Sequence, residues 1–354
     1  MKIPHYSKIH NRFKINGYHY NQQDLTQVAY SFIKEGAAYE EVIGAFLLDW
    51  LDTSPTINVN TSGSTGIPKT IEVSKQAMVR SAVRTGEYFG LEVGDRALHC
   101  LPVDYIAGKM MLVRAMILGL DMHMMEPRLE LYSFDGNYDF CAMIPLQAKN
   151  TLPKIGQIKT LLIGGAPISS SLRTALAAAA ATDAYETYGM TETLTHIAVS
   201  KIVVPQQPFE TLPEIRIGTD ADDCLQIEAP HLSQTPIQTE DIVSLVDSQR
   251  FILIGRKNNV INSGGKKLFP ESLEQELGDI HMPFFFAAQP DSELGEKLIL
   301  LVASETETPA TIRKKLSTLL ESESFRFLKE IYTMPSFVYT PTGKIDRPST
   351  LKLL

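Results

Sequence analysis

Apolar residues between positions 56 and 255 recur in short runs, and stretches with helical periodicity separate these runs. Short apolar runs are typical of buried strands, and a 3.6-residue period is typical of helices that cover them. Strands that alternate with helices imply right-handed crossovers and a largely parallel sheet. The pattern predicts strands at 56–60, 97–101, 121–125, 140–144 and 160–163, and helices at 74–89, 107–118 and 170–181.

The pattern changes after Phe251 to charged turns, a helix that begins at Pro270 and short strands at 284–287 and 298–302. This change favours a second, smaller α+β domain. A length of 354 residues also exceeds the size at which one hydrophobic core usually keeps growing. We therefore expect an α/β protein with a large N-terminal domain of mainly parallel sheets flanked by helices (residues 1–257). A small, mobile α+β C-terminal domain (residues 258–354) should follow.

Composition narrows the class of protein. An apolar content of 44% and a charged content of 21% are ordinary for a globular chain, and a formal net charge of -8 argues against a nucleic-acid partner. No signal peptide is visible, and no run approaches the roughly 18 apolar residues of a membrane span. The three cysteines lie far apart in the sequence, without metal spacing, and are expected to be free thiols. These features predict a cytoplasmic protein without a membrane partner, and a homo-oligomer is compatible with them.

A loop rich in glycine and hydroxyl residues follows the strand predicted at 56–60. Its glycines allow backbone N–H groups to point toward an anion, and its hydroxyls and lysine add donors, so it is a candidate phosphate cradle. Pro68 stands where the P-loop of NTPases needs its second glycine, and proline has no N–H to donate. A flexible surface loop is the alternative. The candidate phosphate-binding residues are Thr61, Ser62, Gly63, Ser64, Thr65, Gly66 and Lys69.

The string from Thr61 to Lys69 resembles the signature loop of the acyl-adenylate-forming superfamily. That superfamily includes acyl- and aryl-CoA ligases, adenylation domains of peptide synthetases, and luciferases. Three further motifs follow in the family's order. The resemblance spans roughly residues 58–347 and implies an enzyme that uses ATP to activate a carboxylic acid. The further motifs are YGMTE at 188–192, TED at 239–241 with GRKNNVINSGG at 255–265, and PTGKIDR at 341–347.

The resemblance implies a role for each residue of the YGMTE motif. Tyr188 would lie against adenine, Thr191 would contact the α-phosphate, and Glu192 would hold Mg²⁺, which prefers one carboxylate together with phosphate oxygens. Lys344, in the last motif, would reach ATP and the acid and complete the catalytic set of Lys344, Thr191 and Glu192. Other residues expected to bind ATP are Gly165, Ala166, Pro167, Gly189 and Met190.

The remaining motifs concern the ribose, coenzyme A and domain movement. By resemblance, Asp241 would accept hydrogen bonds from the ribose hydroxyls, Arg256 would reach the nucleotide, and Asn258 would be the hinge about which the C-terminal domain rotates. A glycine turn could let the pantetheine arm of CoA pass close to the backbone, although a plain turn with solvated lysines is the alternative. The candidate CoA residues are Ser263, Gly264, Gly265 and Lys266.

The chain departs from the family pattern at three places. Glu240 replaces the glycine of the usual Thr-Gly-Asp, and one interpretation is that its side chain faces solvent. Asn258 stands where Asp or Lys is usual, so a charge-dependent bias at the hinge is expected to be lost. The 60 residues before the phosphate loop are few for this family, so part of the N-terminal subdomain is expected to be missing or reduced.

Local strings resemble one branch of the superfamily, the o-succinylbenzoate–CoA ligases of menaquinone biosynthesis. The expected reaction uses MgATP to form an acyl-AMP and then transfers the acyl group to CoA. The strings are Leu101–Lys109, Ile163–Pro167, Thr193–Ala198 and Ile261–Gly265, the last followed by Pro270 and Glu271.

An aromatic dianion needs an apolar slot and a donor for its second carboxylate. Lys109, Arg114 and His196 are the candidate substrate residues, although a surface charge, a structural ion pair and a satisfied core histidine are the respective alternatives. Two other classes of function stay open. One is a different aryl- or acyl-CoA ligase or an amino-acid adenylating enzyme. The other is a nucleotide-binding sensor without turnover, which intact Lys344, Glu192 and Arg256 disfavour.

Overall fold

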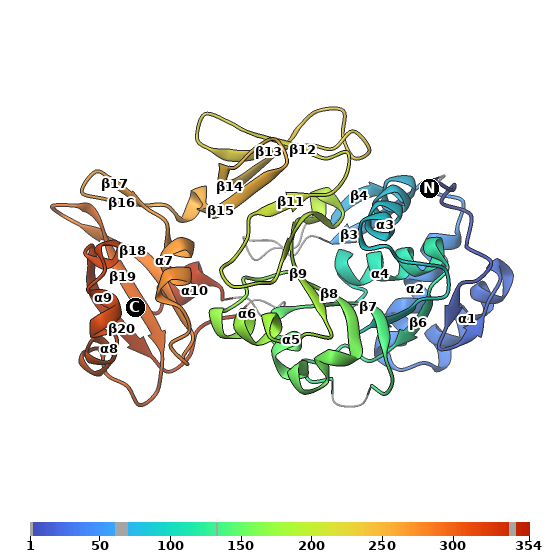
Figure 1. Cartoon of the computed structure of the whole chain (residues 1–354), viewed down its shortest axis with the longest axis horizontal. Coiled ribbons are helices and arrows are strands. Elements are labelled where there is room, and N and C mark those ends of the chain that lie inside the picture. Colours follow the sequence, from blue (N-terminus) through green and yellow to red (C-terminus); the bar gives the residue numbers. More distant parts are fainter. Residues whose placement is uncertain (1–2, 61–69, 132–133, 340–344) are drawn as a thin grey trace. The chain divides into compact units, whose positions relative to one another are not determined.

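The computed structural model describes residues 3–60, 70–131, 134–339 and 345–354. The candidate phosphate loop, from Thr61 to Lys69, and Lys344 lie outside the described residues. The chain forms two compact units (Figure 1). Unit 1 comprises Met1–Ile168, Leu172–Arg216 and Glu228–Ile237, and unit 2 comprises Ser169–Ser171, Ile217–Ile227 and Gln238–Leu354. The domain boundary expected at residue 257 stays a prediction.

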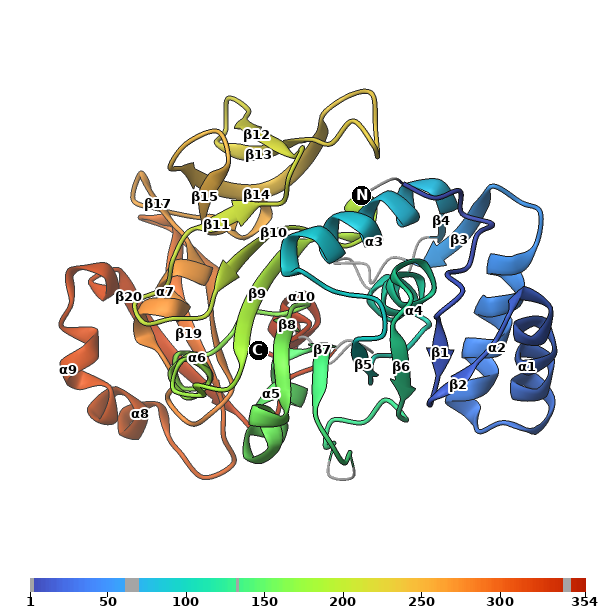
Figure 2. The ribbon, with the colours of Figure 1, turned by 45° about the vertical axis from the view of Figure 1, so that its right-hand side comes forward.

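Unit 1 contains a sheet in which six neighbouring strands, from β9 to β1, run parallel within the described part of the chain. Strands β10 and β11 continue it in antiparallel fashion. The order is β11-β10-β9-β8-β7-β5-β6-β1-β2, and Figure 2 shows its central strands. The predicted, largely parallel sheet is thus confirmed. The strands are β1 (Lys14–Ile15), β2 (Tyr18–His19), β5 (Arg96–His99), β6 (Asp121–Met124), β7 (Tyr138–Met143), β8 (Ile158–Ile163), β9 (Asp183–Gly189), β10 (His196–Lys201) and β11 (Phe209–Thr211).

Helices cover both faces of this sheet. On β5, Ala97 joins the core beneath α1–α4, whereas the next residue, Leu98, joins the core beneath α5, η1 and α6. This division follows from the two-residue period of a strand, which sends successive side chains to opposite faces. The elements are α1 (Gln22–Glu35), α2 (Ala38–Leu51), α3 (Lys75–Phe89), α4 (Ile106–Leu118), α5 (Pro145–Thr151), η1 (Leu152–Gln157) and α6 (Ser170–Ala177).

Helix α3 is as predicted, because Ser74 caps its N-terminus through the Ala77 N–H (3.3 Å) and Gly90 ends it with φ +63°. The strand at 56–60 is present as β3 (Thr56–Asn60), but it pairs antiparallel with β4 (Thr70–Ser74) in a separate two-stranded sheet.

The helix predicted at 170–181 was too long, since α6 ends at Ala177. The next residues form turns, and the hydroxyl of Thr182 donates to the Ile155 carbonyl (2.7 Å). These turns redirect the chain into β9.

Four strands of unit 2 lie next to one another in a sheet, in their order along the described chain. They are β12 (Arg216–Thr219), β13 (Cys224–Glu228), β14 (Ile237–Leu245) and β15 (Arg250–Arg256). A second sheet follows, in which Phe286 faces the core with α7 and α8 while Phe285 faces Phe337 and α10. Its elements are β16 (Ile261–Ser263), β17 (Lys266–Leu268), α7 (Pro270–Leu277), β18 (Phe284–Asp291), β19 (Gly295–Ala303), α8 (Pro309–Lys315), α9 (Ser317–Leu320), β20 (Leu328–Met334) and α10 (Arg347–Leu351). The α/β class and the smaller C-terminal α+β region are confirmed.

Across the described residues, no helix is both long and apolar enough to cross a membrane. Cys100, Cys141 and Cys224 are free thiols, as predicted, and all three are buried.

Candidate active site

Two predicted ATP-binding segments lie at the carboxyl ends of adjacent parallel strands of unit 1. Gly164 and Gly165 follow β8, and the segment from Tyr188 closes β9. Gly165 has φ +86°, which favours glycine, and a Cβ on Gly164 would lie 2.2 Å from Thr187 Oγ1 and would displace that hydroxyl. The carboxyl ends of parallel strands are where such sheets bind ligands. The structure therefore brings the predicted segments 165–167 and 188–190 together.

Tyr188 and Gly189 are fixed by close packing. Tyr188 is 8% exposed, and its ring centroid lies 5.9 Å from that of Phe209. A Cβ on Gly189 would lie 2.2 Å from the carbonyl oxygen of Thr195, on the segment that returns into β10. Only glycine allows this close approach, which holds the connection between β9 and β10 tight.

This connection presents the predicted catalytic side chains. Its short 3₁₀ turn, η2 (Thr191–Thr193), is held by the Thr193 hydroxyl, which accepts from the Met190 N–H (2.9 Å) and donates to the Thr195 carbonyl (2.8 Å). Glu192 is exposed on this turn, and Thr191 is half-buried. A single exposed carboxylate beside a hydroxyl suits Mg²⁺ that keeps water and phosphate oxygens as its other ligands. The residues present therefore fit the metal.

A buried polar cluster lies beside the same connection. Arg114 of α4 is 2% exposed, and its NH2 group donates to Thr195 Oγ1 (3.0 Å). The side chain of His196 lies near two hydroxyls, with Nδ1 3.3 Å from Thr195 Oγ1 and Nε2 3.4 Å from Thr85 Oγ1. Burial lowers the pKa of Arg114 to about 9, and burial followed by Arg114 lowers the pKa of His196 well below its usual value. Two of the three predicted substrate residues are thus neighbours.

The third predicted substrate residue is not part of this cluster. Lys109 Nζ lies 5.1 Å from the ring centroid of Phe46 on α2. Burial lowers the pKa of Lys109, against the opposing effect of Asp104 and Asp49. Lys109 is five residues from Arg114 on α4, which places the two side chains on different sides of the helix.

In unit 2, the predicted ribose and nucleotide residues pair with each other. Asp241 and Arg256 are opposite one another on β14 and β15, and Arg256 Nε lies 3.0 Å from Asp241 Oδ1 in an ion pair. The Asp241 N–H donates to Thr239 Oγ1 (3.1 Å). Glu240 is 53% exposed, and its carboxylate accepts from the amide of Asn258 (2.6 Å). Glu240 is thus exposed to solvent, as expected, and it also has a hydrogen-bond partner that the sequence did not predict.

The predicted CoA loop is a hairpin turn between β16 and β17. Gly264 (φ +55°) and Gly265 (φ +78°) are its two central residues, and a turn with two positive φ angles favours glycine. Ser263 is fully buried, whereas Lys266 is exposed with Nζ 5.8 Å from the Phe327 ring centroid. The turn and Lys266 are therefore accessible to a ligand, and the Ser263 side chain is not.

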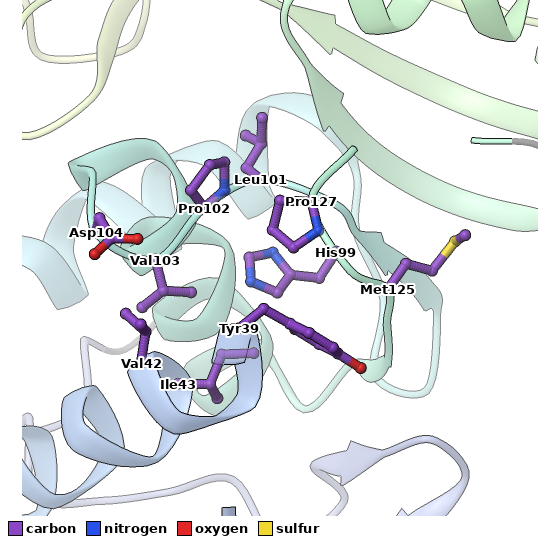
Figure 3. A pocket seen from close by; sticks show the side chains of 10 residues that line it. All are labelled: Tyr39, Val42, Ile43, His99, Leu101, Pro102, Val103, Asp104, Met125 and Pro127. Atoms are coloured by element: carbon purple, nitrogen blue, oxygen red, sulfur yellow. The ribbon is translucent and has the colours of Figure 1, made fainter. Parts of the chain in front are cut away.

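One buried group was not predicted from the sequence. His99 ends β5, is 1% exposed and has no hydrogen-bond partner for either ring nitrogen among the described residues. It lines a cavity of about 30 Å³ (Figure 3). Burial lowers the pKa of His99 to about 4. A cavity of this size holds one or two water molecules and is too small for an organic acid. A histidine within an apolar run carries no sequence signal for such an environment. The residues around the cavity are Tyr39, Val42, Ile43, His99, Leu101, Pro102, Val103, Asp104, Met125 and Pro127.

Comparisons of this chain with known proteins agree on one family. The family model described as AMP-binding enzyme matches residues 53–220. The 2-succinylbenzoate–CoA ligase of Enterococcus faecalis is 26% identical over an alignment of 329 residues, which covers 81% of this chain and 67% of that ligase. The solved structure of o-succinylbenzoate coenzyme A synthetase (MenE) from Bacillus subtilis, in complex with ATP and magnesium ion, supports the fold. Its TM-score is 0.70 at 18% identity, covering 83% of this chain and 69% of that one.

A third protein is similar almost from end to end. It is the acyl-CoA synthetase (AMP-forming)/AMP-acid ligase II-like protein from Dyadobacter fermentans, whose solved structure has a TM-score of 0.61. Its sequence is 32% identical, over 93% of this chain and 98% of that one. The resemblance carried by the motifs is thereby confirmed, and the chain belongs to the family of AMP-binding enzymes.

Proposed function

We propose that this chain is an ATP-dependent acid–thiol ligase that converts o-succinylbenzoate, ATP and CoA into o-succinylbenzoyl-CoA, AMP and pyrophosphate. Membership of the AMP-binding enzyme family supports the use of ATP. The name of the Enterococcus relative, 2-succinylbenzoate–CoA ligase, supports the acid and the thiol. Because ATP and CoA are its co-substrates, we place the reaction in the cytoplasm.

The proposed chemistry has two steps. A carboxylate oxygen of the acid attacks the α-phosphorus of ATP, and the bond to the bridging oxygen breaks, which gives acyl-AMP and pyrophosphate. The thiol of CoA then attacks the acyl carbon, loses its proton to solvent or a base, and AMP leaves. Negative charge increases at phosphorus in the first step, and Thr191 and Lys344 are the groups proposed to stabilise it. Glu192 would hold a Mg²⁺ ion, which would supply further positive charge there.

The observation that carries the choice of acid is the environment of Arg114. Its guanidinium is buried, and no carboxylate lies within ion-pair distance among the described residues. Its one oxygen partner there is the Thr195 hydroxyl, and its Nε has none. A buried cation without an anion is costly in free energy. An acid with a second carboxylate would supply the missing charge, and Arg114 lies beside the turn that carries Glu192.

The proposal is tested by pyrophosphate release across a panel of acids, with and without CoA. O-succinylbenzoate should be the best substrate, and the thioester should form only when CoA is present. Benzoate has the ring without the second carboxylate, and a fatty acid has neither. Faster turnover of either acid, or of an amino acid, would show that the acid has been assigned wrongly. Failure of every acid to release pyrophosphate would contradict the ligase itself.

A further inference from the structure

Four consecutive residues at the end of β15 each pair with a different carboxylate. We call residues 256–259 the joint, since they connect the sheet of β12–β15 to the sheet that begins with β16. The backbone of the joint forms a single 3₁₀ turn, η3 (Lys257–Asn259). The pairs are Arg256 with Asp241 (3.0 Å), Lys257 with Asp222 (2.6 Å), Asn258 with Glu240 (2.6 Å) and Asn259 with Glu271 (2.5 Å). Glu240 also lies 4.0 Å from the guanidinium of Arg256, at the limit of an ion pair.

The four carboxylates hold the joint from two sides. Asp222 precedes β13, and Glu240 and Asp241 belong to β14, so three of them lie on the sheet of β12–β15. Glu271 lies in the first turn of α7, whose Leu273 and Leu277 pack in the core of the second sheet. One short turn has little hydrogen bonding of its own. The side-chain pairs therefore determine the position of residues 256–259 relative to the two sheets of unit 2.

The pair of Glu240 and Asn258 differs from the other pairs to β12–β15. Arg256 and Lys257 carry charges, whereas the amide of Asn258 is neutral and meets Glu240 as a hydrogen-bond donor. A carboxylate at position 258 would instead bring two like charges into contact. Positions 240 and 258 also both depart from the motif pattern of the family. Their side chains contact each other, so the residue that replaces the usual one at position 240 is the hydrogen-bond partner of the residue that replaces the usual one at position 258.

We propose that Glu240 is a positioning residue. Its bond to Asn258 holds the joint in its present setting and so determines how readily the part of the chain after Val260 re-orients between acyl-AMP formation and thioester formation. The part of this inference that concerns the two steps rests on the proposed function. Both side chains are substantially exposed, so the bond is worth a few-fold in an equilibrium rather than several orders of magnitude.

The first test measures the joint itself, without catalysis. Lys257 is 50% exposed and is followed by Asn258, so trypsin can cut between them once the joint opens. Glu240→Ala should speed this cut by about two- to fivefold, as expected for an exposed pair. Mass spectrometry identifies the fragments, and Asn258→Pro should remove them. Glu330→Ala is the matched control, since Glu330 is 44% exposed and pairs with Lys297 at 2.6 Å in the other sheet. Its cleavage at Lys257 should equal that of the wild type.

The second test measures the two half-reactions separately. Asn258→Asp should change the ratio of acyl-AMP formation to thioester formation from pre-made acyl-AMP by about two- to fivefold. Adding Glu240→Gln should restore the ratio, because the Gln amide can donate to the new carboxylate. A purely structural defect would not be rescued in this way.

Two results would overturn the inference. In the first, trypsin cleaves the Glu240→Ala variant after Lys257 at the wild-type rate. In the second, the Asn258→Asp variant is active and keeps the wild-type ratio of acyl-AMP formation to thioester formation. If cleavage changes as expected but no acid yields pyrophosphate, the proposed function fails, while the positioning of the joint by Glu240 stands.

Discussion

Arg114 donates to Thr195 across 3.0 Å, which fixes a buried cation of α4 beside the connection between β9 and β10. Thr195 lies three residues after Glu192, so the candidate acid site and the candidate metal ligand share one short segment.

Arg114→Met should raise the KM for o-succinylbenzoate by about tenfold or more and change the KM for ATP little, because a charge-assisted bond to the second carboxylate is lost. Steady-state kinetics with each substrate varied in turn measure both values. Lys109→Met is the comparison, since Lys109 faces Phe46 instead. An equal effect of Lys109→Met on the acid would contradict the separation of the two residues. Without substrate, Arg114→Met should unfold at the same or a higher temperature, because an unpaired buried cation is removed.

Glu192→Gln should slow acyl-AMP formation by about 10²-fold or more, as expected when a charge that holds the metal at the reacting phosphate is lost. Pyrophosphate release measured over a range of Mg²⁺ concentrations tests this, and the variant should need more Mg²⁺. Wild-type rates at low Mg²⁺ would remove Glu192 as the metal ligand.

Lys344→Ala should abolish acyl-AMP formation and spare thioester formation from pre-made acyl-AMP. The family resemblance assigns this lysine to the first step, in which negative charge increases at phosphorus. Single-turnover assays of each half-reaction provide the measurement. Equal damage to both half-reactions would mean that one arrangement of the C-terminal region serves both.

Gly189→Ala should lower both the rate of acyl-AMP formation and the thermal stability. The added Cβ would lie 2.2 Å from the Thr195 carbonyl oxygen, so the connection that carries Glu192 must move. Gly218→Ala is a control in which the new Cβ has no neighbour within 4 Å. Thermal unfolding and pyrophosphate release should change in the first variant and remain near wild type in the second.

His99 should make the stability of unit 1 depend on pH. Its pKa is about 4 in the folded protein, lowered by burial from an ordinary value of 6.5. The stability tied to its neutral form is therefore fully present above pH 6.5 and is lost as the pH falls toward 4. In His99→Leu, the loss between pH 7.5 and pH 5 should be smaller by roughly 2 kcal/mol. Trp50, the single tryptophan, is buried in unit 1, so its fluorescence during urea unfolding reports the change. Identical pH dependence of both proteins would contradict the burial of a neutral His99.

The sequence predicted those elements whose signals are local. Helix α3 has its cap at Ser74 and its stop at Gly90, and both are readable from neighbouring residues. Helix α1 was missed, although Asn21 and Asp24 form a capping box that marks its start. The pairing of β3 with β4 depends on how the chain returns after the glycine loop, which periodicity does not report.

The candidate site residues divide in the same way, since local motifs indicated which residues they are but not which residues they contact. Motif resemblance assigns Tyr188, Glu192 and Asp241 to a nucleotide site, which stays a prediction, and the structure adds what surrounds each of them. The contact of Arg114 with Thr195 joins residues 81 positions apart, and that of Asn258 with Glu240 joins residues 18 apart. Such pairs arise from tertiary packing. For that reason the sequence listed the charged side chains without their partners.

The antiparallel hairpin of β9 and β10 has a consequence for how such an enzyme can change over evolution. In a purely parallel sheet, each strand end contributes its own loop, and one loop can lengthen without moving the next. Here six residues between Gly189 and His196 contain both the candidate metal ligand and the partner of Arg114. An insertion there would displace both at once. Acquisition of a new acid should therefore proceed by substitution on α4, with the length of this connection kept.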